Sequence, residues 1–370
     1  MISGIIKFCK SQPVMIVAFT AALITVFIVP PDAEYLTYCN RTVLIQLFCL
    51  MTAVAGFRSI GLFENITQFF LGRAGNLRRL GMIFTLICFF SSMLVTNDVA
   101  LLTFVPLTLL IYSRISDEKS RIYTIVLETA AANLGSMITP FGNPQNLYIY
   151  EKYGLTAADF FRTMLPSGIL SLLILLLLCM LLPKTECTAH GLEKKRVSKI
   201  YFTAYTILFT ICLLTVFRTI PDWVCLFIAV ASVLIFDRRL LLKVDYILLA
   251  TFAFFFIFVG NIGRIESVRD FFDNILQGRE LAVSTLLSQV ISNVPAAVML
   301  SGFTDNGTSL LLGVNLGGLG TIIASLASLI SFQFYRKSEN AHSGQYLLVF
   351  SAVNFGMLAI LLPLALIGII

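Results

Sequence analysis

Val95-Thr96-Asn97-Asp98 and Ile291-Ser292-Asn293-Val294 interrupt two long apolar stretches of this 370-residue chain. Further along, the same tripeptide follows each interruption, as Asn133-Leu134-Gly135 and as Asn315-Leu316-Gly317. Polar pairs inside short hydrophobic segments, at corresponding places in two halves of a chain, are the best sequence indication of a transporter's binding site. The repeat therefore predicts a membrane protein with a central site.

The composition supports a membrane protein. Hydrophobic residues make up 58% of the chain and charged residues only 12%, whereas a soluble domain carries about a quarter charged residues. The apolar residues form long blocks, such as 165–182, without the alternation of β-barrel strands. We therefore predict an all-α polytopic membrane protein, with the lipid bilayer as a partner.

Membrane spans are predicted at about 14–29, 43–57, 121–150, 163–182, 200–217, 222–236, 244–263, 308–334 and 345–368. The two interrupted segments, 80–112 and 281–304, behave differently. Each half has about 12–15 residues, too short to span about 30 Å at 1.5 Å per residue. Each segment is therefore predicted to be a re-entrant hairpin, whose turn is surrounded by protein or by a water-filled cavity.

The Lys and Arg residues predict the orientation. If both hairpins return to their own side, most of the 26 basic residues fall on the side of the N-terminus, including the loop Lys194-Lys195-Arg196. Positive residues accumulate in cytoplasmic loops. We therefore expect the inner (plasma) membrane, with the N-terminus in the cytoplasm and the C-terminus in the periplasm or outside the cell.

The duplication extends beyond the polar pairs. Ile60-Gly61-Leu62-Phe63-Glu64 matches Ile262-Gly263-Arg264-Ile265-Glu266, and an odd number of spans separates equivalent elements, so the second copy is inverted. Inverted-topology repeats are typical of secondary transporters that work by alternating access. The predicted organisation is a first repeat over 1–182 (interfacial helix 58–79, hairpin 80–112, broken helix 121–150), a basic loop and linker span over 183–221, and a second repeat over 222–370 (interfacial helix 264–279, hairpin 281–304, broken helix 308–334).

The hairpin tips are the first candidate binding residues. Thr96-Asn97-Asp98 and Ser292-Asn293 fall where a second half-helix would begin at mid-membrane. Such a helix start carries about half a positive charge and free N–H groups, which favour an anion. Side-chain amides and loop carbonyls can instead bind a cation. The competing interpretation is that Asn97 and Asn293 are only helix N-caps.

The broken helices supply the second set. Two prolines and two glycines interrupt 133–146, so its carbonyls and amides are predicted to face inward, and glycines alone interrupt 315–321. Glycine can also serve close helix packing, as we expect for Gly313 and Gly320. The predicted substrate- and ion-binding residues are Thr96, Asn97, Asp98, Asn133, Gly135, Thr139, Gly142, Asn143, Asn146, Ser292, Asn293, Asn315, Gly317 and Gly318, with Na⁺ a candidate ligand of Asn97, Asn133, Asn293 and Asn315.

Two carboxylates stand in apolar surroundings, Asp98 and Glu128. A charge at the bilayer centre costs at least ~2.5–3.5 kcal/mol, so such residues usually serve a function. Each is a candidate for coupling transport to Na⁺ or to H⁺. The alternatives are an N-cap role for Asp98 and an arginine partner for Glu128. Glu64 and Glu266 are expected on solvated helix faces.

Other classes of protein lack their sequence signatures. The eight cysteines contain no CxxC spacing, and His190 and His342 have no acidic or cysteine neighbours, so we expect neither a metal site nor a cofactor. No phosphate-binding GxxxxGK[ST] loop and no nucleophile–base pair is present, which argues against ATP-driven transport and against an enzyme. No nucleic-acid partner is expected. A channel stays open as an alternative, but tips meeting from both sides suit alternating access better.

The tip Thr96-Asn97-Asp98, the segment 139–146 and the second-half segments 313–318 and 324–329 resemble the ion transporter superfamily. That group includes citrate and divalent anion:sodium symporters, arsenite permeases and bacterial Na⁺/H⁺ antiporters. The resemblance implies inverted repeats, an oligomerisation scaffold, a moving transport domain that contains both hairpins, and a homodimer. It also implies an ion-coupled (H⁺ or Na⁺) secondary active transporter of a small anion or oxyanion, with cation/proton antiport or arsenite-type efflux as alternatives.

The tips depart from the dicarboxylate symporters of that superfamily, which carry Ser-Asn-Thr at both tips and contact the substrate carboxylate through the hydroxyls. Here Asp98 adds a negative charge to the first tip, and Val294 removes a hydroxyl from the second. Both changes weaken the case for a di- or tricarboxylate. The second half is more similar to the arsenite permeases.

Overall fold

The computed structural model describes residues 12–72, 74–113, 115, 117–187 and 197–370, and this part of the chain consists of helices and loops without a strand. The elements are α2 (Pro13–Ile28), α3 (Tyr35–Tyr38), α4 (Arg41–Ser59), α5 (Leu62–Leu71), α6 (Leu77–Val95), α7 (Asn97–Tyr112), α8 (Glu118–Ser136), α9 (Pro144–Lys152), α10 (Ala157–Cys179), α11 (Lys199–Val216), α12 (Asp222–Phe236), the 3₁₀ helix η1 (Arg238–Lys243), α13 (Tyr246–Ile262), α14 (Glu266–Leu276), α15 (Glu280–Ile291), α16 (Asn293–Leu300), α17 (Gly307–Leu316), α18 (Leu326–Arg336) and α19 (Ser343–Leu366). The predicted all-α class is confirmed.

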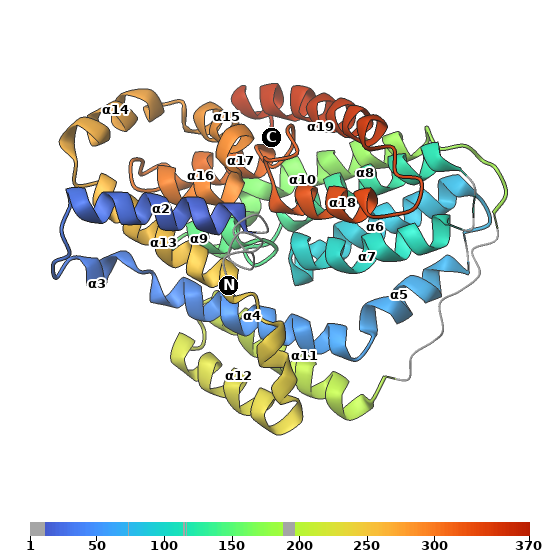
Figure 1. Cartoon of the computed structure of the whole chain (residues 1–370), viewed down its shortest axis with the longest axis horizontal. Helices are drawn as coiled ribbons and strands as arrows, with labels where there is room; N and C mark the ends of the chain where they lie inside the picture. The colour runs from blue at the N-terminus through green and yellow to red at the C-terminus, as the bar shows by residue number, and fades with distance from the viewer. Residues whose placement is uncertain (1–11, 73, 114, 116, 188–196) are drawn as a thin grey trace, which may run out of the picture.

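Helix length and composition agree with a membrane protein. Among the described residues, α4, α6, α10, α11 and α19 are long and apolar enough to cross a bilayer. The chain bends by 101° between α13 and α14. The short amphipathic helices α5 and α14 lie at opposite ends of the molecule (Figure 1). Equivalent elements at opposite ends are what the predicted inverted repeat requires, whereas the exact repeat boundaries stay a prediction.

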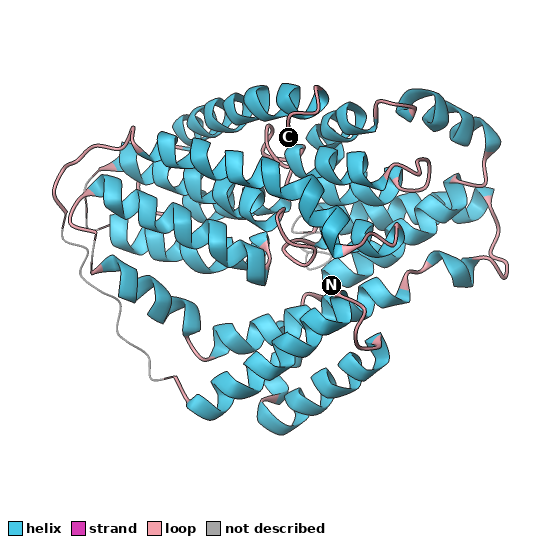
Figure 2. Cartoon of the chain, turned by 180° about the vertical axis from the view of Figure 1, so that it is seen from behind, coloured by secondary structure: helices cyan, strands magenta, loops and turns pink. Residues whose placement is uncertain are grey.

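The helices form two groups. In Figures 1 and 2, α4, α11 and α12 make a separate lower layer, and the hairpins and broken helices make the larger upper body around α8. Twelve of the nineteen Lys and Arg residues in the described part of the chain lie at or near the end of α4, the start of α6, the connection from α7 to α8, the connection from α10 to α11, η1 and the end of α18, and we call this end of the molecule the basic side.

The two halves exchange their first spans. In the first half, α2 packs on α13 of the second half, and the Asn261 amide donates a hydrogen bond to Thr25 Oγ1 (3.2 Å). In the second half, α12 packs on α4 of the first half, and Thr42 Oγ1 donates to Asp222 (3.0 Å). The linker helix α11 packs on both α4 and α12. Neither half therefore completes its own packing.

The first hairpin is longer than predicted. α6 has 19 residues and α7 has 16, against the expected 12–15. The reason is the N-cap at Asn76, whose side chain accepts a hydrogen bond from the Arg79 N–H (2.9 Å) and starts α6 inside the segment expected to be interfacial. The interfacial helix α5 is correspondingly shorter than the predicted 58–79.

Both interrupted segments fold back on themselves. The start of α6 and the end of α7 pack in one apolar cluster, so these helices are antiparallel. In the second hairpin, Thr304 beyond α16 donates a hydrogen bond to Glu280 at the start of α15 (3.4 Å). Both segments are therefore helical hairpins, but their re-entrant course stays a prediction, because α6 is itself long enough to cross a bilayer. Their depth in a bilayer stays a prediction.

Candidate functional site

The two hairpin tips share one unusual backbone conformation. Thr96 has φ 72° and ψ 150°, and Ser292 has φ 77° and ψ 155°. This region is almost restricted to glycine and costs of the order of 1–3 kcal/mol for another residue. The conformation aims the next N–H away from its own hairpin. Non-glycine residues at matched tips in both halves mark the tips as specialised.

Each tip is anchored to the broken helix of its own half. The Asn97 N–H donates a hydrogen bond to the Gly142 carbonyl (3.2 Å), and the Asn293 N–H donates to the Ala324 carbonyl (2.9 Å). A threonine in each break donates back to its hairpin. These bonds are Thr139 Oγ1 to the Met93 carbonyl (2.6 Å) and Thr321 Oγ1 to the Gln289 carbonyl (2.8 Å). Hairpin and break therefore form one docked unit in each half.

The broken helices also exchange side-chain partners across the two halves. The Asn143 amide donates to the Asn315 side-chain oxygen (3.0 Å), and the Asn315 amide donates to the Asn146 side-chain oxygen (2.6 Å). All three residues are at most 4% exposed. Two asparagines from the first half therefore hold the central asparagine of the second half.

Two serines of the second half hold Asn133 of the first half in the same way. Ser325 Oγ donates a hydrogen bond to the Asn133 side-chain oxygen (3.0 Å), and the Asn133 amide donates to Ser328 Oγ (3.4 Å). Ser325 and Ser328 follow Asn315 at the same intervals at which Asn143 and Asn146 follow Asn133. The four contacts therefore obey the same pseudo-twofold relation as the sequence repeat.

Eight half-helix ends meet around this network. The helices that begin here are α7, α9, α16 and α18, and those that end here are α6, α8, α15 and α17. Helix starts present partial positive charge and N–H groups, which suit an anion. Helix ends and unwound carbonyls suit a cation. The geometry can therefore accommodate an anion and a cation next to each other.

The two tip asparagines differ in their contacts. The Asn97 amide donates a hydrogen bond to the Asn133 side-chain oxygen (3.1 Å). The Asn293 side chain lies instead against Gly318, where an added Cβ would stand 3.0 Å from the Asn293 nitrogen. The site is therefore symmetric in its backbone and asymmetric in its side chains.

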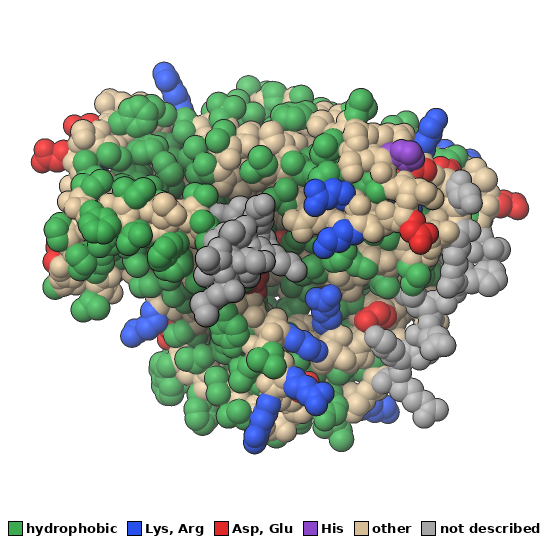
Figure 3. Space-filling model, in the orientation of Figure 1, with side chains coloured by type: hydrophobic (Ala, Val, Ile, Leu, Met, Phe, Trp, Pro, Cys, Tyr) green, Lys and Arg blue, Asp and Glu red, His purple; other side chains and the backbone are tan. Residues whose placement is uncertain are grey.

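A cavity of about 570 Å³ reaches the first tip from the basic side. Thr96 and Asp98 line its inner part, and both are half-buried. Its charged lining residues are Arg58, Glu64, Asp98, Lys243 and Asp245. Figure 3 shows a hollow near the centre of the molecule with Lys and Arg side chains (blue) beside it. Glu64, expected on a solvated helix face, is half-buried in this lining.

Arg58 links the lower layer to the hairpin at this cavity. Pro106 lies inside α7 and has no N–H, so the Leu102 carbonyl one turn earlier loses its helical donor. The Arg58 guanidinium of α4 donates to that carbonyl (3.3 Å). Arg58 therefore bridges α4 and α7 at the point where α7 is interrupted.

Glu128 lies deeper, between α8, α7 and α19, and is fully buried. Thr108 Oγ1 of α7 donates a hydrogen bond to Glu128 Oε1. An arginine partner was one alternative for Glu128. Its contact in the described part of the chain is instead this threonine. The structure thus separates Glu128 from Asp98, which lines the cavity.

The predicted glycines sit at close contacts. A Cβ on Gly135 would stand 2.1 Å from the Phe89 carbonyl oxygen, and one on Gly317 would stand 2.7 Å from Ser288 Cβ. These glycines let α8 approach α6, and α17 approach α15. A Cβ on Gly142 would stand 2.1 Å from the Ser136 carbonyl oxygen within the break. Packing therefore accounts for these glycines, and ligand binding by them stays a prediction.

Three polar residues of the network were absent from the predicted set. Ser325 and Ser328 hold Asn133, and Gln289 holds the second break through bonds from its amide to the Gly317 and Leu319 carbonyls (2.9 Å each). The two serines could have been found by placing the sequence after Asn315 over the sequence after Asn133. Gln289 lies three residues before Ser292 in an apolar half-helix, and a polar residue in that place was a usable signal.

A family model described as citrate transporter matches residues 5–306 of the chain. The chain belongs to this family. An uncharacterized transporter of Methanocaldococcus jannaschii is 32% identical over 321 residues, which cover 86% of this chain and 88% of that protein. The inner membrane protein YbiR of Escherichia coli is 32% identical over 294 residues, which cover 78% of each chain.

The fold also has a solved counterpart. The YdaH transporter of Alcanivorax borkumensis, described as having an unusual topology, superposes with a TM-score of 0.55 at 13% identity, over 91% of this chain and 88% of that one. At this identity the likeness concerns the fold alone. Family and fold confirm the predicted resemblance, and the family confirms a membrane transporter rather than an enzyme.

Proposed function

We propose that this member of the citrate transporter family is an ion-coupled secondary active transporter of a small anion or oxyanion. It works by alternating access and uses H⁺ or Na⁺ as the coupling ion. The observation that carries the proposal is the exchange of partners across the two halves, in which Asn143 and Asn146 hold Asn315 while Ser325 and Ser328 hold Asn133. A site shared by inverted halves can be exposed to either side of the membrane in turn.

The partial charges of the helix ends and the charged side chains around the site support the binding of an anion together with a coupling cation. Four helix starts offer N–H groups to an anion, and four helix ends offer carbonyls to a cation. Arg58 and Lys243 line the cavity and favour the entry of an anion. The tip residues Thr96, Asn97, Ser292 and Asn293 are the proposed ligands at the hairpins.

The direction of the cavity follows from the proposed orientation. Basic residues gather on the side of the membrane that faces the cytoplasm. The N-terminus is then cytoplasmic, the C-terminus lies on the opposite side, and the cavity at Asp98 opens toward the cytoplasm. The inner membrane is supported by the relative YbiR, which is an inner membrane protein.

The lower layer is the proposed scaffold of a homodimer. Large apolar side chains of α12 are exposed, with Trp223 at 67%, Phe227 at 73% and Ile235 at 74%. A lipid-facing or subunit-facing surface accounts for such exposure. Cross-linking of single cysteines placed at Phe227 in membranes tests the dimer, because only a dimer brings two copies of α12 together.

Asp98 supports a second candidate function, cation/proton antiport or arsenite-type efflux. Its carboxyl group lines the same cavity as that of Asp245. Two carboxylates near the tip repel an anion and attract a cation. In this alternative Asp98 carries the exchanging ion directly.

Flux through proteoliposomes separates the candidates. The purified full chain is reconstituted and offered citrate, inorganic phosphate, arsenite or Na⁺ under an imposed pH or Na⁺ gradient. We expect gradient-driven uptake of an anion, and its loss in Asn97→Ala and in Asn293→Ala. Asn354→Ala is the matched control, because Asn354 is also buried but bonds only within its own helix.

Two results would contradict the proposal. Unchanged flux in both tip variants would show that the tips do not form the site. Na⁺/H⁺ exchange without movement of any anion, lost in Asp98→Asn, would support the antiporter instead.

A further inference from the structure

Glu128 occupies a place where the fold does not need a carboxyl group. Glu128 stands five residues before Asn133, and the residue five before Asn315 is Leu310. Both are 0% exposed. The equivalent place in the other half therefore packs a leucine. Because a buried ionisable residue in a membrane is costly, the carboxyl group at Glu128 indicates a function beyond packing.

The surroundings of Glu128 suit a proton better than a metal cation. Oε1 accepts the hydrogen bond from Thr108, and Oε2 has no hydrogen-bond partner among the described residues. The titratable side chains that face it are Cys88 of α6, Tyr112 of α7 and Tyr346 of α19. No charged side chain from the described parts of α10, α17 or α18 contacts it. A metal cation needs several more oxygen ligands, and a proton needs none.

A pair of hydroxyl groups connects Glu128 with the basic side. The Tyr112 hydroxyl and Thr124 Oγ1 are hydrogen-bonded at 2.8 Å. Thr124 lies one turn before Glu128 on α8, and Tyr112 lies one turn after Thr108 on α7. Tyr112 also lines a second cavity, of about 250 Å³, on the basic side. The hydroxyl pair thus stands between this cavity and Glu128.

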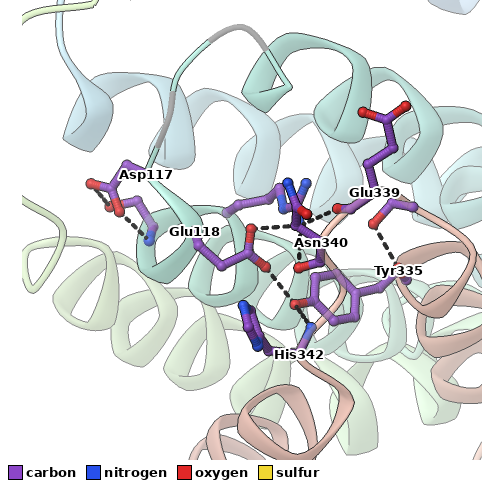
Figure 4. A network of polar contacts seen from close by, with 9 residues as sticks. Asp117, Glu118, Tyr335, Glu339, Asn340 and His342 are labelled. Carbon is purple, nitrogen blue, oxygen red and sulfur yellow. Dashed lines mark hydrogen bonds and ion pairs between the residues drawn. The ribbon is translucent and has the colours of Figure 1, made fainter.

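The wall of the second cavity carries polar and charged side chains. Glu118 is paired with Arg121 (2.5 Å) and accepts a hydrogen bond from the Tyr335 hydroxyl (2.5 Å). The backbone N–H of His342 donates to the same hydroxyl (2.9 Å), as Figure 4 shows. Tyr335 stacks on Tyr346 (4.8 Å between ring centres), which faces Glu128. The second cavity is therefore walled by polar and charged groups on the basic side.

The two cavities border different parts of one half-helix, the start and the end of α7. Asp98 and Leu102 of α7 line the cavity proposed for the anion, whereas Thr108 and Tyr112 face α8. We propose that Glu128 is the proton-binding site of the transporter, loaded from the basic side through Tyr112 and Thr124 and separate from the anion cavity. This proposal rests on the proposed function. Because α7 borders both sites, movement of α7 couples them.

Infrared difference spectroscopy after a pH step tests the assignment without any substrate. The full chain is reconstituted in vesicles of phosphatidylethanolamine and phosphatidylglycerol, and the carbonyl band of a neutral buried carboxyl group is followed. We expect a pH-dependent band that is lost in Glu128→Gln and in Glu128→Leu and shifted in Glu128→Asp. Glu266→Gln is the control, because Glu266 is exposed on α14. Leu310 shows that the leucine variant suits the fold.

A separate variant tests the proposed proton route through Tyr112 and Thr124. Tyr112→Phe is expected to slow the appearance of the band several-fold and to leave its amplitude unchanged. A pH-dependent band that persists in Glu128→Gln, or that disappears in Asp98→Asn instead, would overturn the assignment. An unchanged rate in Tyr112→Phe would overturn the route.

Failure of the function and failure of this inference give different results. The first case is a protein that moves none of citrate, phosphate or arsenite, but whose infrared carbonyl band is lost in Glu128→Gln. This result would support the proton site and contradict the proposed transport. The second case is a protein that transports an anion with a pH gradient but shows no infrared band from Glu128. This result would support the proposed function and refute the proton site at Glu128.

Discussion

Thr96 and Ser292 illustrate how single residues set up the site. Each holds a positive φ that glycine adopts without cost, and each directs the following asparagine N–H to a carbonyl in the neighbouring break. Thr96 lines the cavity, and Ser292 Oγ donates to the Ala324 carbonyl (3.3 Å). We propose that the side chains at these positions serve the candidate site at the expense of local stability.

Replacing Thr96 with glycine should stabilise the protein. Relief of strain of about 1–3 kcal/mol outweighs the entropic cost of glycine, about 0.5–1 kcal/mol, so we expect a net gain of about 1 kcal/mol. Thermal unfolding of the purified protein in detergent measures it. Thr103→Gly, in the interior of α7, is the control and should destabilise the protein, because glycine has a lower helix propensity than threonine. A lower unfolding temperature for Thr96→Gly would contradict the strain.

Replacing Asn315 with alanine should destabilise the centre. The change leaves the Asn146 side-chain oxygen without its donor and removes one of the two acceptors of the Asn143 amide, which keeps its bond to Ser136 Oγ (3.2 Å). Each unsatisfied buried group costs about 1–3 kcal/mol. We expect a loss well above that of Asn354→Ala, which removes one bond to its own helix. Equal losses in denaturant unfolding would argue against the shared network.

The sequence located the asparagines but not all of their partners. Asn97, Asn133, Asn293 and Asn315 stood out because amides are rare in apolar segments. Ser325 and Ser328 did not stand out, because small residues are common at helix contacts in membranes. Their role depends on the distance between two segments that lie far apart in the chain, which a local pattern does not contain.

At the scale of elements, α7 depends on a partner from outside its own hairpin. Its internal Pro106 frees the Leu102 carbonyl, and Arg58 of α4 supplies the missing donor. This contact joins the lower layer to the hairpin at the cavity. It has to break if the hairpin moves against α4.

A double-mutant cycle tests this contact. Arg58→Ala should cost about 1 kcal/mol or less, because Arg58 is exposed and the bond is weakened by solvent. In the Pro106→Ala background, the new backbone N–H of residue 106 donates to the Leu102 carbonyl. The loss of stability caused by Arg58→Ala should then vanish. Pro166→Ala in α10 is the control, in which the effects should add. Additivity with Pro106→Ala would show that Arg58 does not act through the Leu102 carbonyl.

Helix identity was more predictable than helix ends. The predicted spans 200–217 and 222–236 correspond closely to α11 and α12 because apolar runs determine them. The start of α6 was wrong because the Asn76 cap lies within a polar, basic stretch that resembles an interfacial segment. The start of a capped helix depends on a single hydrogen bond, which a hydropathy pattern does not predict.

At the scale of the whole molecule, the proposed orientation places two native cysteines on opposite sides of the membrane. Cys39 is exposed beside α3, and Cys187 lies partly exposed on the basic side. With each kept as the sole cysteine, a membrane-impermeant maleimide added to whole cells should label Cys39 and spare Cys187. A permeant maleimide, which should label both, is the control. Labelling of Cys187 alone would invert the topology.

The exchange of partners between the halves has a consequence for biogenesis. Asn146 precedes its partner Asn315 by 169 residues, and Asn133 precedes Ser325 by 192. A ribosome therefore delivers the first half to the membrane well before those partners exist. Until the second half has been made, Asn133 and Asn146 lack these hydrogen-bond partners. The central network is therefore completed only at the end of synthesis. A truncated first half is expected to be a substrate for membrane quality control rather than a partial transporter.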